Sequence, residues 1–172
     1  MSLRHRGLFA GLAVVSIAAF VAPLVGHPTT SVGAVTGVDL VLNVSCAQTS
    51  ATELTCEISV TNAGDTADES GVFVVAGATH TEWTSFSGNG WNCDIASNDH
   101  LECQWNDTIE PGETTATITA VGTLNSAFTC PVHALVPVDL ASAHDSGSAG
   151  NGNWVMSEVD MTCSSSSSTT TS

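Results

Sequence analysis

Residues 91–105 read WNCDIASNDHLECQW, and this stretch decides the fold. A tryptophan, a cysteine and an aliphatic residue recur in reverse order on the two sides of its centre. If the two halves form a hairpin in which the cysteines face each other, the aliphatic residues and the tryptophans also face each other. The expected cross-strand pairs are Cys93 with Cys103, Ile95 with Leu101, and Trp91 with Trp105. All six then lie on one face of a sheet, where cross-strand neighbours stabilise the pairing.

The same two-residue period continues on both sides of this hairpin. Apolar and polar residues alternate over 38–46 and 54–61, a pattern typical of half-buried strands, and residues 62–65 (NAGD) predict a turn. Further strands are expected over 71–76, 114–121, 128–140 and 154–163. No helical period is present beyond the N-terminal segment. We therefore predict an all-β fold, an immunoglobulin-like β-sandwich of about seven strands over residues 35–163.

The six cysteines predict a disulfide framework, because an even count is typical of exported domains, although 15 pairings are formally possible. Cys46 and Cys56 fall at inward positions of the first two strands. Placing Cys130 opposite Cys163 also opposes Val132 to Met161, Ala134 to Val159 and Val138 to Val155. The predicted bonds are Cys46–Cys56, Cys93–Cys103 and Cys130–Cys163, each closing a hairpin. Zinc ligation requires closer pairs such as C-x-x-C, so no metal or cofactor is expected.

The two ends of the chain have compositions unlike the middle. Arg4, His5 and Arg6 precede an apolar run over 8–25 and small residues at 32–34, which is the pattern of a secretory signal peptide. We expect residues 1–34 to be this peptide, with cleavage after Ala34. An uncleaved anchor is the alternative, because residues 8–25 are long enough to span a bilayer. Residues 164–172 are only Ser and Thr, so we expect a disordered tail, either an O-glycosylated stalk or an end without a role.

Charge excludes several classes of partner. All seventeen acids lie at or beyond Asp39, and no Lys or Arg follows Arg6. Nucleic acids and anionic membrane surfaces are bound by Lys and Arg, so neither is an expected partner. Strong like charge also favours a soluble monomer. Drift in an acid-rich set of secreted proteins, life in high salt, and escape from trypsin-like cleavage all remain open as explanations of the missing basic residues.

Three motifs resemble a family of bacterial and archaeal surface modules, the "conserved repeat" domains of unknown function. They are residues 57–64 (EISVTNAG), the pair 91–93 (WNC) and 101–103 (LEC), and residues 109–114 (IEPGET), in the family's order. The resemblance implies an immunoglobulin-like sandwich with adhesive, spacing or scaffold roles and no catalytic residues. The chain differs from the family in its single copy, its two extra cysteine pairs and its lack of the aspartate-leucine-proline stretch.

No motif in the chain indicates catalysis. The histidines are dispersed, and neither G-x-S-x-G nor H-E-x-x-H occurs, so we expect no enzyme activity. Asp65, Asp68 and Glu69 offer oxygens to Ca²⁺, but a solvated loop explains them as well. Asn43 and Asn106 fit the N-glycosylation pattern.

Trp83 and Phe86 are the candidate contact residues. They lie in the Gly/Ser-rich stretch 79–90, which we interpret as a loop, and exposed aromatic rings there could stack on a sugar or a protein. Core packing is the alternative for both. The expected function is a secreted or cell-surface, non-catalytic structural or adhesion module whose partner is an extracellular protein or glycan. The alternative is a carbohydrate-binding module that uses Trp83 and its neighbours.

Overall fold

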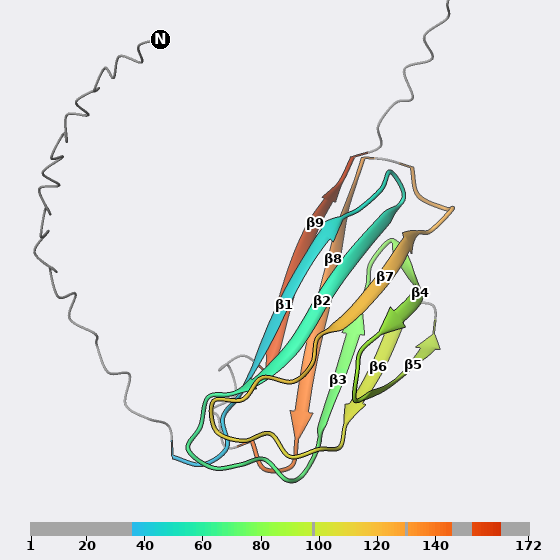
Figure 1. Cartoon of the computed structure of the whole chain (residues 1–172). Helices are drawn as coiled ribbons and strands as arrows, with labels where there is room; N and C mark the ends of the chain where they lie inside the picture. The colour runs from blue at the N-terminus through green and yellow to red at the C-terminus, as the bar shows by residue number, and fades with distance from the viewer. Residues whose placement is uncertain (1–35, 98, 130, 146–152, 163–172) are drawn as a thin grey trace, which may run out of the picture. The chain divides into compact units, whose positions relative to one another are not determined.

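The computed structural model describes residues 36–97, 99–129, 131–145 and 153–162, which form a two-layer β-sandwich (Figure 1). One sheet has the order β1-β2-β7-β4, and the other has the order β5-β6-β3-β8-β9. The strands of the first sheet are β1 (Leu40–Gln48), β2 (Glu53–Asn62), β7 (Ile118–Leu124) and β4 (Thr81–Ser87). Those of the second are β5 (Trp91–Ser97), β6 (His100–Trp105), β3 (Val72–Gly77), β8 (Val132–Ser142) and β9 (Trp154–Met161). All strand pairs are antiparallel, which confirms the predicted all-β sandwich.

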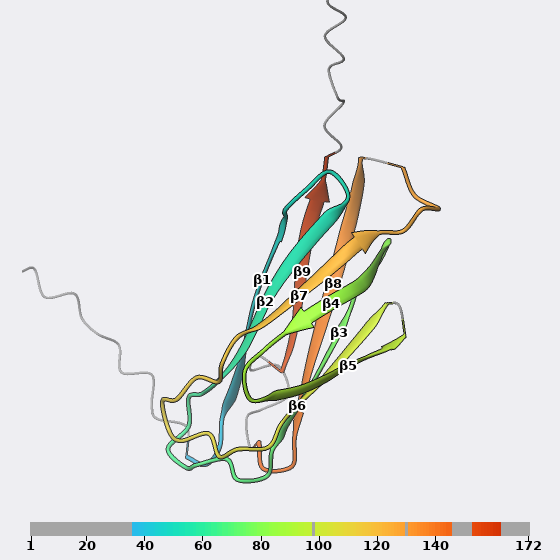
Figure 2. The same cartoon turned by 45° about the vertical axis from the view of Figure 1, so that its right-hand side comes forward.

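The described residues form nine strands rather than about seven, and β4 is the element that the sequence did not indicate. Gly and Ser residues around β4 favour a loop, and a register shift between Trp83 and Ser85 interrupts its two-residue period. Figure 2 shows β4 at the edge of its sheet, next to β7. The predicted strand over 114–121 is also shorter at its start, because β7 begins at Ile118.

The core lies between the sheets and is built from the inward residue of each alternating pair. The hairpin that decides the fold has the predicted register, with Trp91 opposite Trp105, Cys93 opposite Cys103 and Ile95 opposite Leu101. The two tryptophan rings lie with their centroids 5.3 Å apart, and Trp91 Nε1 donates to the carbonyl of Ala116 at 2.7 Å. The hairpin therefore contributes aromatic surface to the core together with its cysteines.

Two disulfides are present among the described residues, Cys46–Cys56 and Cys93–Cys103, each joining directly opposed residues of one hairpin. Chain-entropy arguments give each such bond about 2.5–3 kcal/mol of stabilisation. Cys130 and Cys163 lie outside the described residues. The β8–β9 register nevertheless pairs Val132 with Met161, as the predicted third bond requires. That bond stays a prediction.

One buried amide joins four segments at the end of the sandwich where β1 begins. Asn62 has no exposed surface, and its Nδ2 donates to the carbonyls of Thr66 at 2.8 Å and Ile109 at 2.9 Å. Its Oδ1 accepts from the backbone N–H groups of Gly64 at 3.1 Å and Asp39 at 3.4 Å. The amide thus satisfies its own polar atoms and those of the surrounding turns, which burial requires.

Two glycines make this arrangement possible. A Cβ on Gly64 would lie 2.0 Å from the carbonyl oxygen of Gly37, so no larger residue fits there. Gly112 has φ of 79°, a left-handed conformation that glycine adopts without strain, and its N–H donates to the carbonyl of Asn62 at 2.7 Å. The NAG turn and the Pro-Gly turn that the family resemblance singled out therefore contact each other.

The predicted signal peptide over 1–34 and the predicted tail over 164–172 lie outside the described residues. The described residues include no helix that is long enough and apolar enough to cross a bilayer.

The cysteine pairing can be checked on the oxidised protein. Trypsin cannot fragment it beyond Arg6, so an unreduced digest at Asp and Glu is required. We expect mass spectrometry to find a peptide containing Cys130 joined to one containing Cys163. Free thiols, or a bond from either residue to Cys46 or Cys56, would contradict the pairing of neighbouring strands.

Replacing the buried amide tests its structural role. Asn62→Ala removes four hydrogen bonds, two donated to the carbonyls of Thr66 and Ile109 and two accepted from the N–H groups of Gly64 and Asp39, and each is worth about 0.5–1.5 kcal/mol. We expect the free energy of unfolding in urea to fall by about 3 kcal/mol. Asn43→Ala, an exposed asparagine on the neighbouring strand, serves as the matched control and should change it by no more than about 0.5 kcal/mol. Equal losses in the two variants would argue against a special role for Asn62.

Candidate functional site

Exposed apolar side chains gather on one face of the molecule. Among the described residues, the large exposed hydrophobic side chains are Phe73, Phe86, Phe128, Trp154 and Met156. Three of them point outward from the five-stranded sheet: Trp154 is 55% exposed, Phe73 39% and Met156 36%. Single exposed apolar residues need no explanation, but a group on one face marks a contact surface.

The outward positions follow from strand alternation. On β8, Ala134, Val136 and Val138 are buried, so the residues between them face solvent. The apolar residues that face outward on this sheet are Phe73, Val75, Leu135, Pro137, Trp154 and Met156, and we call this surface the Trp154 face. A hollow of about 210 Å³ borders it beside Phe73, and one of about 430 Å³ borders it beside His133 and Asp160.

The pairing of the strands arranges these residues in rows. One row crosses all five strands in the order Asp94, Glu102, Val75, Asp139, Trp154, each residue opposite the next. In the adjacent row, Pro137 lies opposite Met156, and a Cβ on Gly77 would lie 3.2 Å from the Pro137 ring. Neighbouring strands are about 4.8 Å apart, so the row of five is about 19 Å wide. The Asp139 carboxylate therefore stands between two apolar side chains.

Acids share this face with the apolar residues. Besides Asp94, Glu102 and Asp139, it carries Glu158 and Asp160 on β9. The ring of His133 lies 2.7 Å from Asp160 and 3.6 Å from Glu158, measured between the nearest nitrogen and oxygen atoms. The remaining three acids take part in none of the ion pairs found among the described residues.

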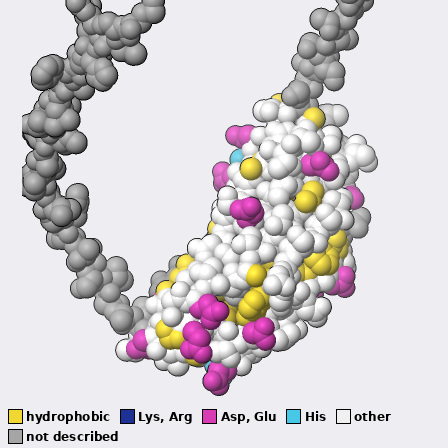
Figure 3. All heavy atoms as spheres, viewed as in Figure 1, with side chains coloured by type: hydrophobic (Ala, Val, Ile, Leu, Met, Phe, Trp, Pro, Cys, Tyr) yellow, Lys and Arg dark blue, Asp and Glu magenta, His cyan; other side chains and the backbone are white. Residues whose placement is uncertain are grey.

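The outer face of the four-stranded sheet is different. Its outward residues are mainly Thr, Ser and Asn, with the acids Glu53, Glu57 and Glu82 and the aliphatic residues Val41 and Val121. Figure 3 shows this side, over β1, β2 and β7: backbone and uncharged polar side chains make up most of the surface, acidic and some apolar side chains are scattered over it, and no Lys or Arg side chain is in view. The large exposed apolar side chains that point outward from a sheet are therefore concentrated on the five-stranded sheet.

Trp83 lies in the core, which corrects the prediction that it is an exposed contact residue. It is 4% exposed, and its Nε1 donates to the carbonyl of Ala76 at 3.0 Å. It lies opposite Gly122 on β7, and the indole packs over this glycine, 3.4 Å from where a Cβ would stand. The alternative of core packing is thus the correct one for Trp83.

Phe86 is exposed but stands apart from the Trp154 face. It is 39% exposed and lies on β4, the edge strand of the other sheet. The structure does not bring Trp83 and Phe86 together into one surface. The sequence analysis did not select Trp154, although its predicted pairing indicated the position of this residue. If Val138 pairs with Val155, Trp154 lies opposite Asp139, on the solvent side of the sheet.

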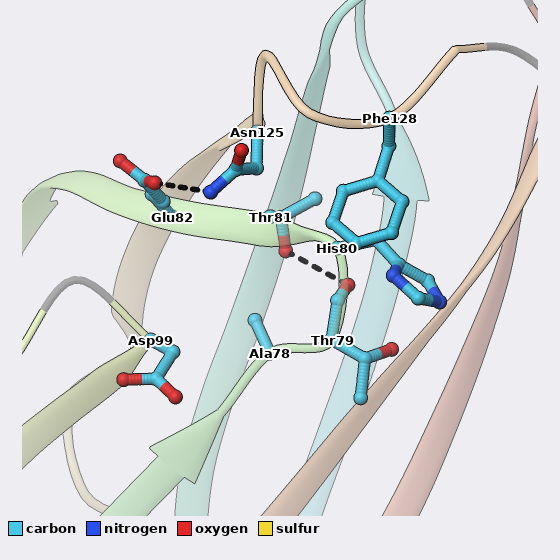
Figure 4. A pocket seen from close by; sticks show the side chains of 8 residues that line it. All are labelled: Ala78, Thr79, His80, Thr81, Glu82, Asp99, Asn125 and Phe128. Atoms are coloured by element: carbon cyan, nitrogen blue, oxygen red, sulfur yellow. Dashed lines mark hydrogen bonds between the residues drawn. The ribbon is translucent and has the colours of Figure 1, made fainter.

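A pocket of about 390 Å³ lies beside the crossover from β3 to β4 (Figure 4). Its walls are Ala78, Thr79, His80, Thr81, Glu82, Asp99, Asn125 and Phe128. The rings of His80 and Phe128 lie 4.2 Å apart between centroids, and Asn125 Nδ2 donates to Glu82. His80 has φ of 62°, in the left-handed region. Its carbonyl accepts the N–H of Asn125 at 2.8 Å, which ties the crossover to the loop after β7.

Hydrogen bonds occupy both hydroxyl groups that line this pocket. The hydroxyl of Thr81 donates to the carbonyl of Thr79, and the hydroxyl of Thr79 accepts the N–H of Leu135 at 2.8 Å. Hydrogen bonds from Ser97, at 2.7 Å, and from His100 lower the pKa of the Asp99 carboxyl below its ordinary value. Asp99 is therefore ionised at neutral pH and attracts hydrogen-bond donors.

The acids suggested for Ca²⁺ do not converge. Asp68 is buried and accepts hydrogen bonds from Ser70 and Ser142. The N–H of Gly37, and then the hydroxyl of Thr66, lower the pKa of Asp65, which faces that turn. Across the described part of the chain, no three His, Cys, Asp or Glu side chains are grouped to hold a metal.

The two candidate glycosylation sites differ in setting. Asn43 lies within β1, and its Nδ2 donates to the hydroxyl of Thr61 at 3.0 Å. Asn106 is exposed just after β6. A glycan on either residue remains a prediction.

Comparison with known proteins identifies the fold but no family. No family model and no curated protein matches this sequence. The collagen-binding subdomain of the Enterococcus faecalis surface protein ACE superposes with a TM-score of 0.53 at 10% identity, over 69% of this chain and 95% of that one.

Two cohesins superpose comparably. The sixth cohesin of Acetivibrio cellulolyticus scaffoldin B, solved with a Cel5 dockerin, gives a TM-score of 0.51 at 10% identity over 73% of this chain and 99% of its own. A cohesin module from a Clostridium perfringens family 33 glycoside hydrolase gives 0.51 at 5% identity over 73% and 96%. At such identities the likeness shows a shared sandwich fold with bacterial binding modules.

Selective oxidation can test the exposure of the tryptophans. N-bromosuccinimide reacts with accessible indoles, so at limiting reagent we expect Trp154 to be oxidised first in the folded protein. Trp83 and Trp91 should react only after unfolding, because both are buried. Peptide mass spectrometry gives the order, and oxidation of Trp83 at the same rate as Trp154 would contradict the burial described above.

Proposed function

We propose that this protein is a secreted or cell-surface, non-catalytic binding module that contacts a partner protein through the Trp154 face. The observation that carries the proposal is the gathering of Trp154, Met156 and Phe73 on the outer side of one sheet. Large aromatic side chains and Met are enriched in protein interfaces, and Trp is a frequent source of binding energy there.

We propose that the module is exported from the cell. The two disulfides are typical of oxidising compartments. In the proposal, residues 1–34 direct export, cleavage follows Ala34, and the exported chain is a monomer because its charge is strongly negative. The similarity to a collagen-binding subdomain and to a cohesin solved with a dockerin supports a protein as partner.

The size of the face suits a protein interface. Five strands about 4.8 Å apart, with an average length of about eight residues at about 3.3 Å each, outline on the order of 500 Å². A standard interface buries about 800 Å² on each partner. The face can therefore supply most of one side of a stable complex without a contribution from the pocket beside His80.

A carbohydrate partner is the second candidate, and the exposure of Trp154 favours it. An indole that is 55% exposed on a flat sheet can stack on a sugar ring. This candidate replaces Trp83 by Trp154, because Trp83 is buried.

Substitution of Trp154 tests the proposed face. Wild-type protein, Trp154→Ala and Phe86→Ala are compared for binding to immobilised extracellular matrix and cell-wall proteins and to a glycan array. We expect Trp154→Ala to weaken protein binding at least tenfold, since a Trp that is a hot spot of an interface contributes 2 kcal/mol or more. Phe86→Ala, which removes an exposed aromatic ring from the other sheet, should bind as the wild type does.

The outcomes separate the candidates. Trp154-dependent binding to glycans alone would replace the protein partner by a sugar. Binding that is unchanged in Trp154→Ala would overturn the choice of face.

A further inference from the structure

We propose that the partner of the Trp154 face is a basic polypeptide segment, with Lys or Arg side chains placed between apolar ones. This inference rests on the proposed function and adds the chemistry of the partner. It is argued from the pattern of acids among the apolar residues, from the lack of internal cations, and from the contrast with the other sheet.

The acids on this face alternate with the apolar residues instead of forming a separate rim. Asp139 lies opposite Val75 on one side and Trp154 on the other, so its carboxylate is one strand spacing, about 4.8 Å, from each. An apolar partner covering Trp154 would bury this carboxylate without a counterion, which costs several kcal/mol. A partner ammonium or guanidinium at the same position would pair with Asp139 and lie beside the Trp154 ring, where cations are attracted to the indole.

The second half of the row extends the requirement for positive charge. Asp94 lies opposite Glu102, and Glu102 lies opposite Val75. Like charges directly opposite each other destabilise a sheet, so this pair opposes folding in the free protein. A basic group bound between them would relieve that repulsion, and the relief adds to the binding free energy.

The chain itself supplies no such group. No Lys or Arg occurs beyond Arg6, and the ion pairs of the described residues involve only histidines. On this face His133 is held by Asp160 and Glu158, and His100 contacts Asp99. In the free protein, the negative charges of Asp94, Glu102 and Asp139 are therefore compensated only by ions from the solvent.

A second copy of the chain does not fit this face. A symmetric pair would bring the same five acids of each copy together across an apolar contact, and like charges facing each other disfavour association. The opposite sheet also carries acids, but its outward residues are mostly hydroxyl-bearing. Among the described residues, large apolar groups and interleaved acids occur together only on the Trp154 face.

A random peptide library provides the probe, because the natural partner is unidentified. Displayed twelve-residue peptides are selected on the oxidised full-length protein, and enriched sequences are compared with the unselected library. We expect enrichment of Lys and Arg together with aromatic or aliphatic residues, and depletion of Asp and Glu. Individual enriched peptides are then synthesised and titrated against the variants.

The variants assign the binding to particular carboxylates. Asp139→Asn and Glu102→Gln should each weaken the enriched peptides roughly two- to fivefold, as expected for exposed charge pairs. Affinity should also fall as salt is raised from 50 to 500 mM, through screening. Glu57→Gln, on the outer face of the other sheet, is the matched control and should leave affinity unchanged.

The failures are distinguishable. Suppose that the peptides lose binding in Trp154→Ala but contain no basic residues, or that their affinity does not change with Asp139→Asn or with salt. Either result would overturn the proposal of a basic partner and leave the proposed face intact. Peptides that bind Trp154→Ala as well as the wild type would overturn the face itself. No peptide enrichment combined with Trp154-dependent glycan binding would replace the polypeptide by a sugar.

Discussion

The buried amide of Asn62 is the constraint on which this sandwich depends. It joins the end of β2 to the start of β1, to the turn at Thr66 and to the segment at Ile109 before β7. An amide without exposed surface must find protein partners for its oxygen and its nitrogen, and here every partner is a backbone group. The site where the chain leaves one sheet for the other is thereby fixed in position. Gly64 is required there because the backbone of Gly37 passes so close, and Gly112 because its backbone is left-handed.

Disulfides act at the edges, where the hydrogen-bonded ladder is weakest. β1 and β5 are edge strands of their sheets, and each of the two observed bonds ties one of them to its neighbour. The predicted Cys130–Cys163 bond belongs to the hairpin of β9, another edge strand. Edge strands open more easily than central ones, and a chain of seventeen acids and no internal cations increases that tendency through repulsion. Crosslinks at the edges therefore oppose the repulsion where the sheets are most easily opened.

Local pairing was predictable from the sequence, and the contact surface was not. The mirrored residues of 91–105 specify one register because a shift by one residue would turn the cysteines and tryptophans to solvent. The sequence of β4 gives no comparable signal, since its register shift interrupts the alternation and its serines favour a loop. Trp83 was misplaced for that reason, because its buried position involves Ala76 on β3 and Gly122 on β7, which no local pattern brings next to it. The Trp154 face could not be predicted from local sequence either, because it joins β3 to β8 and β9, which are far from β3 in sequence.

The combination of acids and apolar groups on one flat surface is costly for a free protein and favourable for a bound one. The charge of seventeen acids opposes aggregation, which the exposed Trp, Met and Phe side chains would otherwise favour. The same acids exclude copies of the chain and other acidic proteins from that surface, which leaves it open to partners of opposite charge. Because these side chains stand on paired strands and not on loops, association need not order the backbone that carries them. In the proposed complex, negative charge would thus select the partner, and the apolar rows would supply the contact that holds it.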